Sequence, residues 1–305
     1  MFDNNLSELC VFYCLTPLHA GAGQATGAID LPIQRERHTA WPQVQSSGVK
    51  GAFRDWFYRY QKAHGEEPLA KKLTQQIFGS EESGDSDGGQ AGAVSFSDAR
   101  LLAFPVRSNV APFVWVTCPA VLDRLNHDLL LVSGLEPFQI EAPKAETGFI
   151  VKDDGSIGGA KQVIMEDMCI DLKPSPDNIQ SILVFLEKQI PRLTRLILIA
   201  DSDYSYLVRT STEVQPQIKI DIDTGTAQDG SLRYQELLPS DSVLYSLVFF
   251  SNEKKRDSTV LAEIIKGHVK DAIATHIQMG GDVTLGRGLV EVKWSSSPAK
   301  SGGDK

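Results

Sequence analysis

Residues 27–57 read GAIDLPIQRERHTAWPQVQSSGVKGAFRDWF. The first part contains one isolated aspartate, Asp30, which follows Gly27 and precedes Pro32 and is therefore expected in a loop. Further on, apolar residues fall at 49, 52, 53, 56, 57 and 60, the one-sided pattern of an amphipathic helix whose other side is basic. The stretch predicts a loop that presents a carboxylate, followed directly by a helix with a basic face.

Apolar patterns on both sides of this stretch alternate between strands and helices. Residues 8–16 form a continuous apolar and aromatic run that ends at Pro17, as in a buried strand. Further strands are expected at 93–104, 113–117, 242–250 and 289–294, and helices at 69–78, 118–131, 178–190 and 260–277. This mixture of strands and helices indicates an α+β fold.

The remaining segments predict loops and one projecting hairpin. Residues 217–238 contain two strand-like runs around a turn, and their polar character on both faces indicates a hairpin that projects from the body. Residues 80–93 are rich in Gly, Ser, Asp and Glu and predict a mobile loop. Residues 134–176 show no assignable pattern, and the tail at 295–305 is expected to be disordered.

The composition is that of a globular protein. Of the 305 residues, 42% are hydrophobic and 23% are charged. No apolar run is long enough to cross a bilayer, and the first residues lack a signal-peptide pattern, so we expect no membrane contact and a cytoplasmic location. The four cysteines are scattered without metal-binding spacing and are expected to be buried free thiols.

Charge is unevenly distributed along the chain. The formal net charge of -9 argues against nonspecific nucleic-acid binding, because such binding depends on clustered lysines and arginines. Residues 79–98 carry five acids and no base, whereas basic side chains are concentrated in 34–72. A local anion-binding surface is therefore compatible with the acidic total.

The start of the predicted helix is a candidate phosphate site. The small residues Ser46, Ser47 and Gly48 leave N–H donors and the positive end of the helix dipole exposed. Lys50 and Arg54 lie four residues apart on one helix face, so one phosphate could meet both. The alternative is a capped surface helix whose basic face is only solvated.

Asp30 and His19 are candidates for chemistry, each with a structural alternative. One loop aspartate beside basic residues suffices for Mg²⁺, because that ion keeps waters and takes substrate phosphates as ligands. The same aspartate also fits a turn cap. His19 either relays a proton or acts as a structural hydrogen-bond donor. The glycine-rich segments match neither a Walker loop nor a dinucleotide fingerprint, and neither a zinc spacing nor a Ser-His-Asp arrangement is visible.

Several motifs together resemble one protein family. They are LTPLHAGAGQATGAIDLPIQRERHTAWPQVQSSGVKGAFRD at 15–55, AGAVSFSDARLLAFPVRS at 91–108, FVWVTCPAVLDR at 113–124, GSLRYQELLPSDSVLYSLVFF at 230–250 and MGGDVTLGRGLV at 279–290. The matches run from about residue 11 to residue 290 and are weakest in 134–176. On these motifs the chain resembles RAMP-superfamily CRISPR proteins, and among them the repeated backbone subunit that cleaves target RNA in the type III-B (Cmr) effector complex.

The resemblance implies a single RRM-like (ferredoxin-like) palm domain over residues 6–294, with large insertions. These insertions are expected to be a flexible acidic loop at 79–93, a mainly helical segment at 118–190 and a projecting β-hairpin, the thumb, at 202–240. The disordered tail would then occupy residues 295–305.

The resemblance also implies a function on RNA. Copies of such a subunit stack head to tail along a guide crRNA, beside other Cmr subunits, and each thumb displaces one base of the guide–target duplex. The subunit is a metal-dependent endoribonuclease that uses a divalent ion, Mg²⁺ or Mn²⁺, and cuts the complementary target RNA at regular spacing. The expected partners are therefore crRNA, target RNA, further copies of the chain and the other subunits of the complex.

The family pattern assigns roles to individual residues. Asp30 is expected to be the catalytic, metal-binding aspartate, and His19 a catalytic helper. Where the family carries two acids before a Leu-Pro step, this chain has Gln235 and Glu236, so only Glu236 is expected to act as a catalytic thumb acid. Gly48 replaces a serine usual in the family, which removes one hydroxyl contact. RNA contacts are expected from Gln34, Arg35, Arg37, His38, Ser47, Gly48, Lys50, Arg54, Gly286, Arg287 and Gly288.

The implied chemistry is attack of a ribose 2′-OH on the adjoining phosphate, which leaves a 2′,3′-cyclic phosphate. Asp30 would hold the ion, and His19 or a metal-bound hydroxide would take the proton. Two alternatives stay open. The chain could be a noncatalytic scaffold on the guide RNA, or a guide-processing nuclease of the same superfamily, although the motifs fit the second poorly.

Overall fold

The computed structural model describes most of the chain, namely residues 6–80, 89–132, 139–176, 179–255 and 260–295. Most of the predicted flexible loop at 79–93, and all but the first residue of the predicted disordered tail, lie outside the described residues. Within the described part, no helix combines the length and the apolar character needed to cross a membrane.

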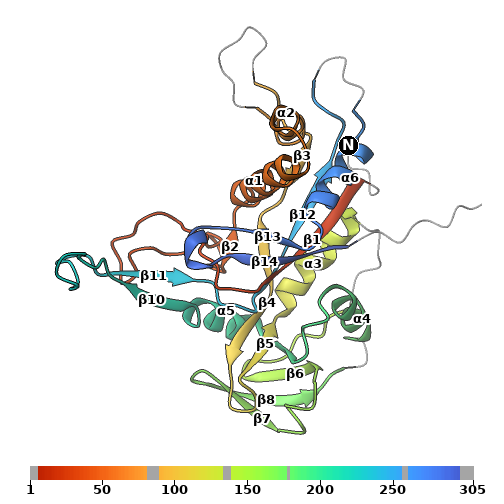
Figure 1. Ribbon diagram of the computed structural model, residues 1–305. Coiled ribbons are helices and arrows are strands. Elements are labelled where there is room, and N and C mark those ends of the chain that lie inside the picture. The colour runs from red at the N-terminus through yellow and green to blue at the C-terminus, as the bar shows by residue number, and fades with distance from the viewer. Residues whose placement is uncertain (1–5, 81–88, 133–138, 177–178, 256–259, 296–305) are drawn as a thin grey trace, which may run out of the picture.

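Most of the described strands belong to one large mixed sheet (Figure 1). Its twelve strands are β1 (Ser7–Cys14), β2 (Gln43–Val44), β3 (Val94–Phe96), β4 (Ala99–Arg107), β5 (Phe113–Thr117), β6 (Thr147–Lys152), β7 (Gln162–Met165), β8 (Met168–Pro174), β9 (Leu196–Ile199), β12 (Val243–Phe250), β13 (His276–Gln278) and β14 (Leu289–Ser295). They follow the order β13-β14-β1-β12-β4-β5-β9-β6-β8-β7, with β2 beside β4 and β3 beside β12. β1 is buried along its whole length, because it pairs with β12 on one edge and β14 on the other and because residues 9–14 form most of the apolar run noted in the sequence.

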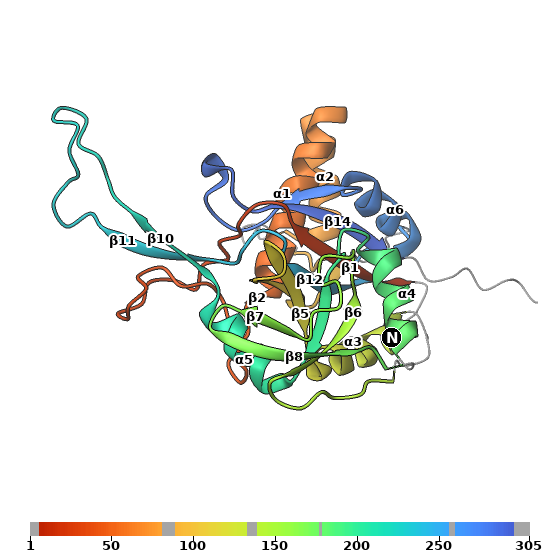
Figure 2. The same cartoon turned by 90° about the horizontal axis from the view of Figure 1, so that it is seen from below.

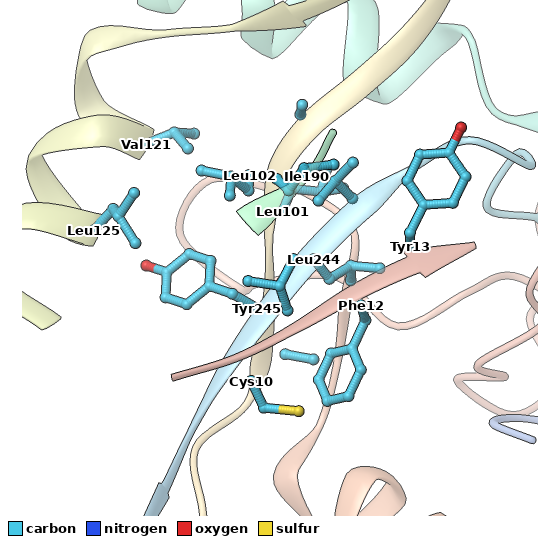
Figure 3. Close-up of a cluster of buried hydrophobic side chains, with 14 of the residues drawn as sticks. Cys10, Phe12, Tyr13, Leu101, Leu102, Val121, Leu125, Ile190, Leu244 and Tyr245 are labelled. Carbon is cyan, nitrogen blue, oxygen red and sulfur yellow. The ribbon is translucent and has the colours of Figure 1, made fainter. Parts of the chain in front are cut away.

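Helices cover both faces of the sheet around β1. They are α1 (Ser46–His64), α2 (Glu67–Phe78), α3 (Pro119–Val132), α4 (Gln180–Gln189), α5 (Asp201–Thr210) and α6 (Ala262–Ala272), with the 3-10 helix η3 (Val283–Leu285). On one face the rings of Phe53 in α1 and Phe12 in β1 meet edge to face, with centroids 6.1 Å apart. On the other face the Tyr245 hydroxyl of β12 donates to the Asp128 carboxylate of α3 at 2.8 Å. Figure 3 shows Phe12 on one side of the strands and Tyr245 with Leu125 on the other. The predicted α+β class is confirmed.

The insertion at 118–190 was predicted to be mainly helical, but in the structure it is mixed. It contains α3 and α4 but also β6, β7 and β8, which extend the sheet beyond β9. In β7, Val163 and Met165 are buried while Gln162 and Ile164 are exposed, which is the period of two that defines a strand with one buried face. Strands this short are hard to separate from loops by pattern alone.

A second, two-stranded sheet is formed by β10 (Glu213–Gln217) and β11 (Arg233–Leu237), and this hairpin projects from the body as predicted (Figure 2). Its bounds differ from the predicted 202–240, because α5 occupies the start of that segment. β10 also begins earlier than the predicted run at 217, and it accepts Pro216 because it is an edge strand. Beyond the paired strands, Ile220 and Ala227 form an isolated bridge.

The four cysteines are free, but only three of them are buried. Cys10 and Cys14 lie in β1, and burial raises the pKa of the Cys14 thiol to about 12. Cys169 is exposed, which corrects the prediction that all four are buried. Its neighbour Ile170 is fully buried, so the alternation of side chains along β8 turns Cys169 outward.

Candidate functional site

The free edge of β11 brings the two catalytic candidates together. One edge of β11 pairs with β10, and the other edge forms an antiparallel bridge between Leu238 and Leu18 and a parallel bridge between Gln235 and Leu31. Because His19 follows Leu18 and Asp30 precedes Leu31, both residues lie along this edge. Two loop segments that are distant from β11 in the sequence thus meet on one strand.

Asp30 is fixed by the main chain of β11. Its Oδ2 accepts a hydrogen bond from the Tyr234 N–H at 2.7 Å, and its own N–H donates to the Tyr234 carbonyl at 3.1 Å. The carbonyl of Asp30 accepts the Ala25 N–H at 3.0 Å, which closes the preceding loop. Within the described residues, Oδ1 has no hydrogen-bond partner. The structure therefore holds a half-buried carboxylate in place with one oxygen available.

His19 is oriented by the same strand. Its Nδ1 lies 2.8 Å from the carbonyl oxygen of Glu236, and because a carbonyl only accepts, Nδ1 must donate. The neutral ring then carries its lone pair on Nε2. A Cβ atom at Gly21 would lie 2.9 Å from Nε2, so the glycine keeps the space beside that nitrogen open. The backbone contacts of Asp30 and His19 are two residues apart on β11, about 7 Å along the strand.

Glu236, which was predicted to be a catalytic thumb acid, does not present a free carboxylate oxygen beside Asp30. The side chain is buried, and Oε2 accepts the Ile33 N–H at 3.0 Å. Oε1 accepts the Thr212 hydroxyl at 2.7 Å and pairs with the Arg35 Nη2 at 2.5 Å. Both oxygens are thus engaged in holding three segments together, and the carboxylate is a structural anion.

Arg35 is likewise internal, although it was predicted to bind RNA. Besides Glu236, its guanidinium donates from Nη1 to the carbonyls of Ala40 at 2.8 Å and Val208 at 3.2 Å. Gln34 also has internal partners, because its Nε2 donates to the Gly21 carbonyl and its Oε1 accepts the Gln45 N–H. The basic and polar loop after Asp30 therefore largely braces the site.

The next two predicted RNA-binding residues do face solvent. Arg37 is exposed, and His38 is exposed with its Nε2 3.7 Å from a Glu36 carboxylate oxygen. Both line a polar surface pocket of about 330 Å³ that also contains Arg100 and Arg124. The Arg37 guanidinium and the His38 ring are therefore accessible to an external anion.

The α1 residues predicted to bind phosphate line a common groove. Ser47, Lys50 and Arg54 face the end of α2 and the following segment across a groove of about 450 Å³. Gly48 lies exposed in the same first turn. Ser47, Lys50 and Arg54 thus share one groove, and Gly48 is exposed beside them without lining it.

The α1 N-terminus itself is less open than predicted. The Ser46 N–H donates to Asp98 Oδ1 at 2.7 Å, and the N–H groups of Gly48 and Val49 both donate to the Gln45 carbonyl. Of the first four N–H groups, only that of Ser47 has no partner among the described residues. Because Asp98 already places a carboxylate at the positive end of the dipole, the groove's side chains offer the main contacts to an anion.

The glycine-rich segment 280–288 contains three further residues predicted to contact RNA, and among Gly286, Arg287 and Gly288 only Gly286 is exposed. Gly288 is required by packing, because a Cβ there would lie 1.9 Å from the Met279 carbonyl oxygen. Gly286 has a φ of 72° and open space around it, so it remains accessible. Arg287 is largely buried, and its guanidinium donates to Gln235 at 2.9 Å and Gln215 at 2.7 Å. Arg287 is therefore bound to the base of the hairpin.

The residues that brace the site from the hairpin side were not predicted from the sequence. Gln215, Gln217 and Gln235 lie on one face of β10 and β11, since they alternate with Val214, Pro216 and Tyr234. The glutamines repeated at every second position could have indicated a shared polar face, because strand periodicity places such residues on one side. Thr212 and Asp282 gave no such signal.

Known proteins match this chain over nearly its whole length. Residues 11–291 match the RAMP superfamily. A relative from Pyrococcus furiosus, the CRISPR system Cmr endoribonuclease Cmr4, is 33% identical over 287 residues, which is 92% of each chain. The crystal structure of oligomeric Cmr4 from that organism has a TM-score of 0.68 at 27% identity and covers 96% of this chain and 98% of that one. A cryo-EM structure of the type III-B Cmr-beta bound to cognate target RNA shares the fold, with a TM-score of 0.71 at 21% identity over 94% and 96% of the two chains. The chain belongs to the RAMP superfamily and, within it, to the Cmr4 family of CRISPR proteins.

Proposed function

We propose that the protein is a backbone subunit of a cytoplasmic type III-B CRISPR effector and that it cleaves RNA paired to the guide. The observation that carries this proposal is the Asp30 carboxylate, held on β11 by the Tyr234 N–H with Oδ1 left available. The relative from Pyrococcus furiosus is named an endoribonuclease, and its crystal structure is described as oligomeric. In this proposal, copies of the chain and the other Cmr subunits assemble along one crRNA.

The palm and thumb of the family correspond, in this proposal, to the sheet around β1 and to the projecting β10–β11 hairpin (Figure 2). The hairpin projects from the body, and Ile222, in the outer segment between β10 and β11, is almost fully exposed. An apolar side chain presented in this way would insert between stacked bases and displace one of them. The displaced nucleotide would lie on the same hairpin that holds Asp30 at its base.

The RNA backbone would follow the accessible cationic surfaces. Ser47, Lys50 and Arg54 offer one groove for phosphates, and Arg37 with His38 lines a second pocket. Such contacts position RNA without reading its sequence, because sequence is read by base pairing with the guide. A net acidic chain can bind RNA in this manner because only these local surfaces need to be basic.

A divalent ion, Mg²⁺ or Mn²⁺, fits Asp30 as a single-carboxylate site. No group of three or more His, Cys, Asp or Glu side chains that could enclose a metal occurs in the described part of the chain. Mg²⁺ commonly binds through one or two carboxylates and completes its shell with waters and substrate phosphates, so Oδ1 of Asp30 is a sufficient protein ligand. When bound, the ion would stabilise negative charge on the reacting phosphate.

The residues of this chain would act on the RNA as follows. The ribose 2′-oxygen forms a bond to the adjoining phosphorus while the bond to the 5′-oxygen breaks, giving a 2′,3′-cyclic phosphate and a 5′-hydroxyl. His19 is suited to take the 2′-OH proton on Nε2, because Nδ1–H is already committed to the Glu236 carbonyl. A proton from solvent completes the 5′-hydroxyl.

Cleavage by the Asp30→Asn variant tests the proposal. Asparagine keeps an oxygen that can accept the Tyr234 N–H, so the loop should remain folded while the negative charge is lost. In a reconstituted guide complex with Mg²⁺, single-turnover cleavage of labelled complementary RNA should fall by at least about 100-fold, with target binding unchanged. A target with 2′-deoxyribose at the cut position should also resist cleavage.

Two outcomes would overturn parts of the proposal. Undiminished cleavage by Asp30→Asn would make this chain a noncatalytic scaffold and place the nuclease in another subunit. Normal cleavage of the deoxy target would show that water, rather than the 2′-OH, is the nucleophile.

A further inference from the structure

Arg287 lies in a closed polar cluster at the base of the hairpin. Its Nη1 donates to Gln235 Oε1 at 2.9 Å and its Nη2 donates to Gln215 Oε1 at 2.7 Å, so one guanidinium links both strands. Asp282 Oδ2 accepts from the same Nη1 at 3.2 Å and from Gln235 Nε2 at 2.7 Å. Only 12% of the Arg287 side chain is exposed. The cluster therefore joins the glycine-rich loop to β11.

The same loop also contacts His19. The Gly281 N–H donates to the His19 carbonyl at 2.9 Å. Gly280 lies so close that a Cβ there would be 2.5 Å from that carbonyl oxygen. On the other side of the cluster, Gln235 directly follows Tyr234, whose N–H holds Asp30. A chain of contacts thus runs from His19 through this loop to Asp30.

We propose that Arg287 is a positioning residue that fixes the separation of His19 from Asp30 by joining the loop 280–288 to β11, rather than a ligand of RNA. This inference rests on the proposed function, in which both residues act on the scissile phosphate. It accounts for the near-complete burial of the one arginine in a loop where the resemblance implies an RNA contact. Asp282 adopts a left-handed backbone with a φ of 59°, which a non-glycine residue adopts at a cost. The contacts of its carboxylate offset that cost.

The Arg287→Lys variant distinguishes a positioning role from phosphate binding. Two separate nitrogens of the guanidinium reach two glutamines, whereas a lysine ammonium is a single point that cannot span both. A phosphate contact, in contrast, is largely preserved by lysine because it depends on charge. Arg287→Lys should therefore slow single-turnover cleavage by roughly 10- to 100-fold, the effect of a small misplacement of reacting groups.

The salt dependence of target-RNA binding by the reconstituted complex supplies the second readout. Arg287→Lys and Arg287→Gln should leave the slope of log affinity against log salt unchanged. Arg54→Gln, which removes a cation from the α1 groove, should reduce the slope by about 1. Arg192→Gln removes an arginine paired with Glu291 outside the site and should change neither readout. Wild-type cleavage by Arg287→Lys, or a reduced slope for Arg287→Gln, would overturn the inference.

A charge exchange within the cluster adds a test by rescue. Gln235→Glu places a second carboxylate against Asp282 and should lower the cleavage rate. Adding Asp282→Asn restores one carboxylate, one amide and one guanidinium with the positions exchanged, and should recover most of the rate. Additive losses in the double variant would contradict the proposed cluster.

Hydrogen exchange in the isolated chain separates this inference from the proposed function. Arg287→Gln should accelerate exchange of the Tyr234 and Gly281 amides by about tenfold or more, because their segments are no longer joined. Arg192→Gln should not. If Asp30→Asn cleaved normally while Arg287→Gln showed this acceleration, the joining role would stand and the catalytic assignment would fall. Unchanged exchange would reject the joining role whatever the cleavage result.

Discussion

Glu236 joins three segments of the chain through one buried carboxylate. Its oxygens accept the Ile33 N–H and the Thr212 hydroxyl and pair with Arg35. The sequence predicts a chemical role for this acid because only its type and position in a motif are visible there. Its hydrogen-bond partners come from distant parts of the chain and determine that the role is structural.

Removing this carboxylate should destabilise the fold. Glu236→Ala leaves the Arg35 guanidinium without its counter-ion in a largely buried position, and we expect the free energy of unfolding to fall by about 3 kcal/mol. Glu236→Gln should cost less, since the amide oxygen still accepts a hydrogen bond. Urea unfolding of the isolated chain measures both changes. The control is Glu166→Ala, whose pair with the exposed Arg107 should contribute about 0.5 kcal/mol, and an equal loss in both variants would contradict this view.

The buried hydroxyl of Tyr245 should make the stability of the fold depend on pH. Burial, with the Asp128 carboxylate as hydrogen-bond acceptor, raises the pKa of its hydroxyl well above the usual value. Because the folded pKa is raised, the stabilisation is complete below about pH 10 and is lost as the pH rises further, by about 1.4 kcal/mol per pH unit for this one proton. The free energy of unfolding, measured in urea between pH 9 and pH 11, should fall less steeply with pH in Tyr245→Phe, by the contribution of one proton. An unchanged slope would show that this hydroxyl does not remain protonated in the fold.

At the scale of elements, the loop 280–288 offers two glycines that differ in their surroundings. Gly286 and Gly288 both have positive φ angles, of 72° and 71°. Only Gly288 is crowded, since a Cβ there would meet the Met279 carbonyl at 1.9 Å, while a Cβ at Gly286 meets nothing within 4 Å. Substitutions at the two glycines therefore distinguish the cost of a left-handed backbone from the cost of a steric clash.

Alanine substitutions at these glycines should differ clearly. Gly286→Ala should reduce the free energy of unfolding by about 1 kcal/mol, the cost of a left-handed alanine. Gly288→Ala should lose at least about 2 kcal/mol, because the backbone must also shift. Thermal and urea unfolding of both variants measures the difference. Equal losses of unfolding free energy would mean that the connection between β13 and β14 can shift at little cost.

The elements that the sequence predicts well are those with long, regular patterns. The apolar run of β1 and the one-sided spacing of α1 locate both elements, because each pattern repeats over many residues. β6, β7 and β8 are short, with few repeats of their period, and were not separable from loops. The hairpin was anticipated, but its base was misplaced because β10 contains Pro216, a residue that is unusual within paired strands.

At the scale of the whole molecule, tertiary partners decide which basic residues are accessible. Arg35 and Arg287 pair internally with residues far away in the sequence, whereas Lys50 and Arg54 line an open groove. Motif resemblance placed all four on an RNA surface. It also placed Asp30 and His19 in one site, and in the structure both residues hydrogen-bond to the main chain of β11. Sequence spacing alone could not show this, because the strand that joins them lies roughly 200 residues further along the chain.

Thiol accessibility provides a global test of the fold. Cys10, Cys14 and Cys118 are buried, and burial raises the pKa of each thiol, so these groups stay neutral and unreactive. Iodoacetamide at pH 8 should modify Cys169 within minutes and leave the others intact until the chain unfolds. Mass spectrometry of the native and urea-unfolded protein measures this, with Cys169→Ser as the unlabelled control. Rapid native labelling of Cys14 would contradict the packing of β1.

The hairpin has one consequence for engineering. The hairpin's own contacts with Asp30 and His19 lie at its base. Farther out, the two arms are joined by backbone contacts around the bridge between Ile220 and Ala227, such as the hydrogen bond from the Gln228 N–H to the Lys219 carbonyl at 2.8 Å. The arm could therefore be shortened, lengthened or exchanged without altering the register of β11. The distance that the hairpin spans could then be changed independently of the residues proposed to cut RNA, because only the outer arm would vary while its junction with the body stays constant.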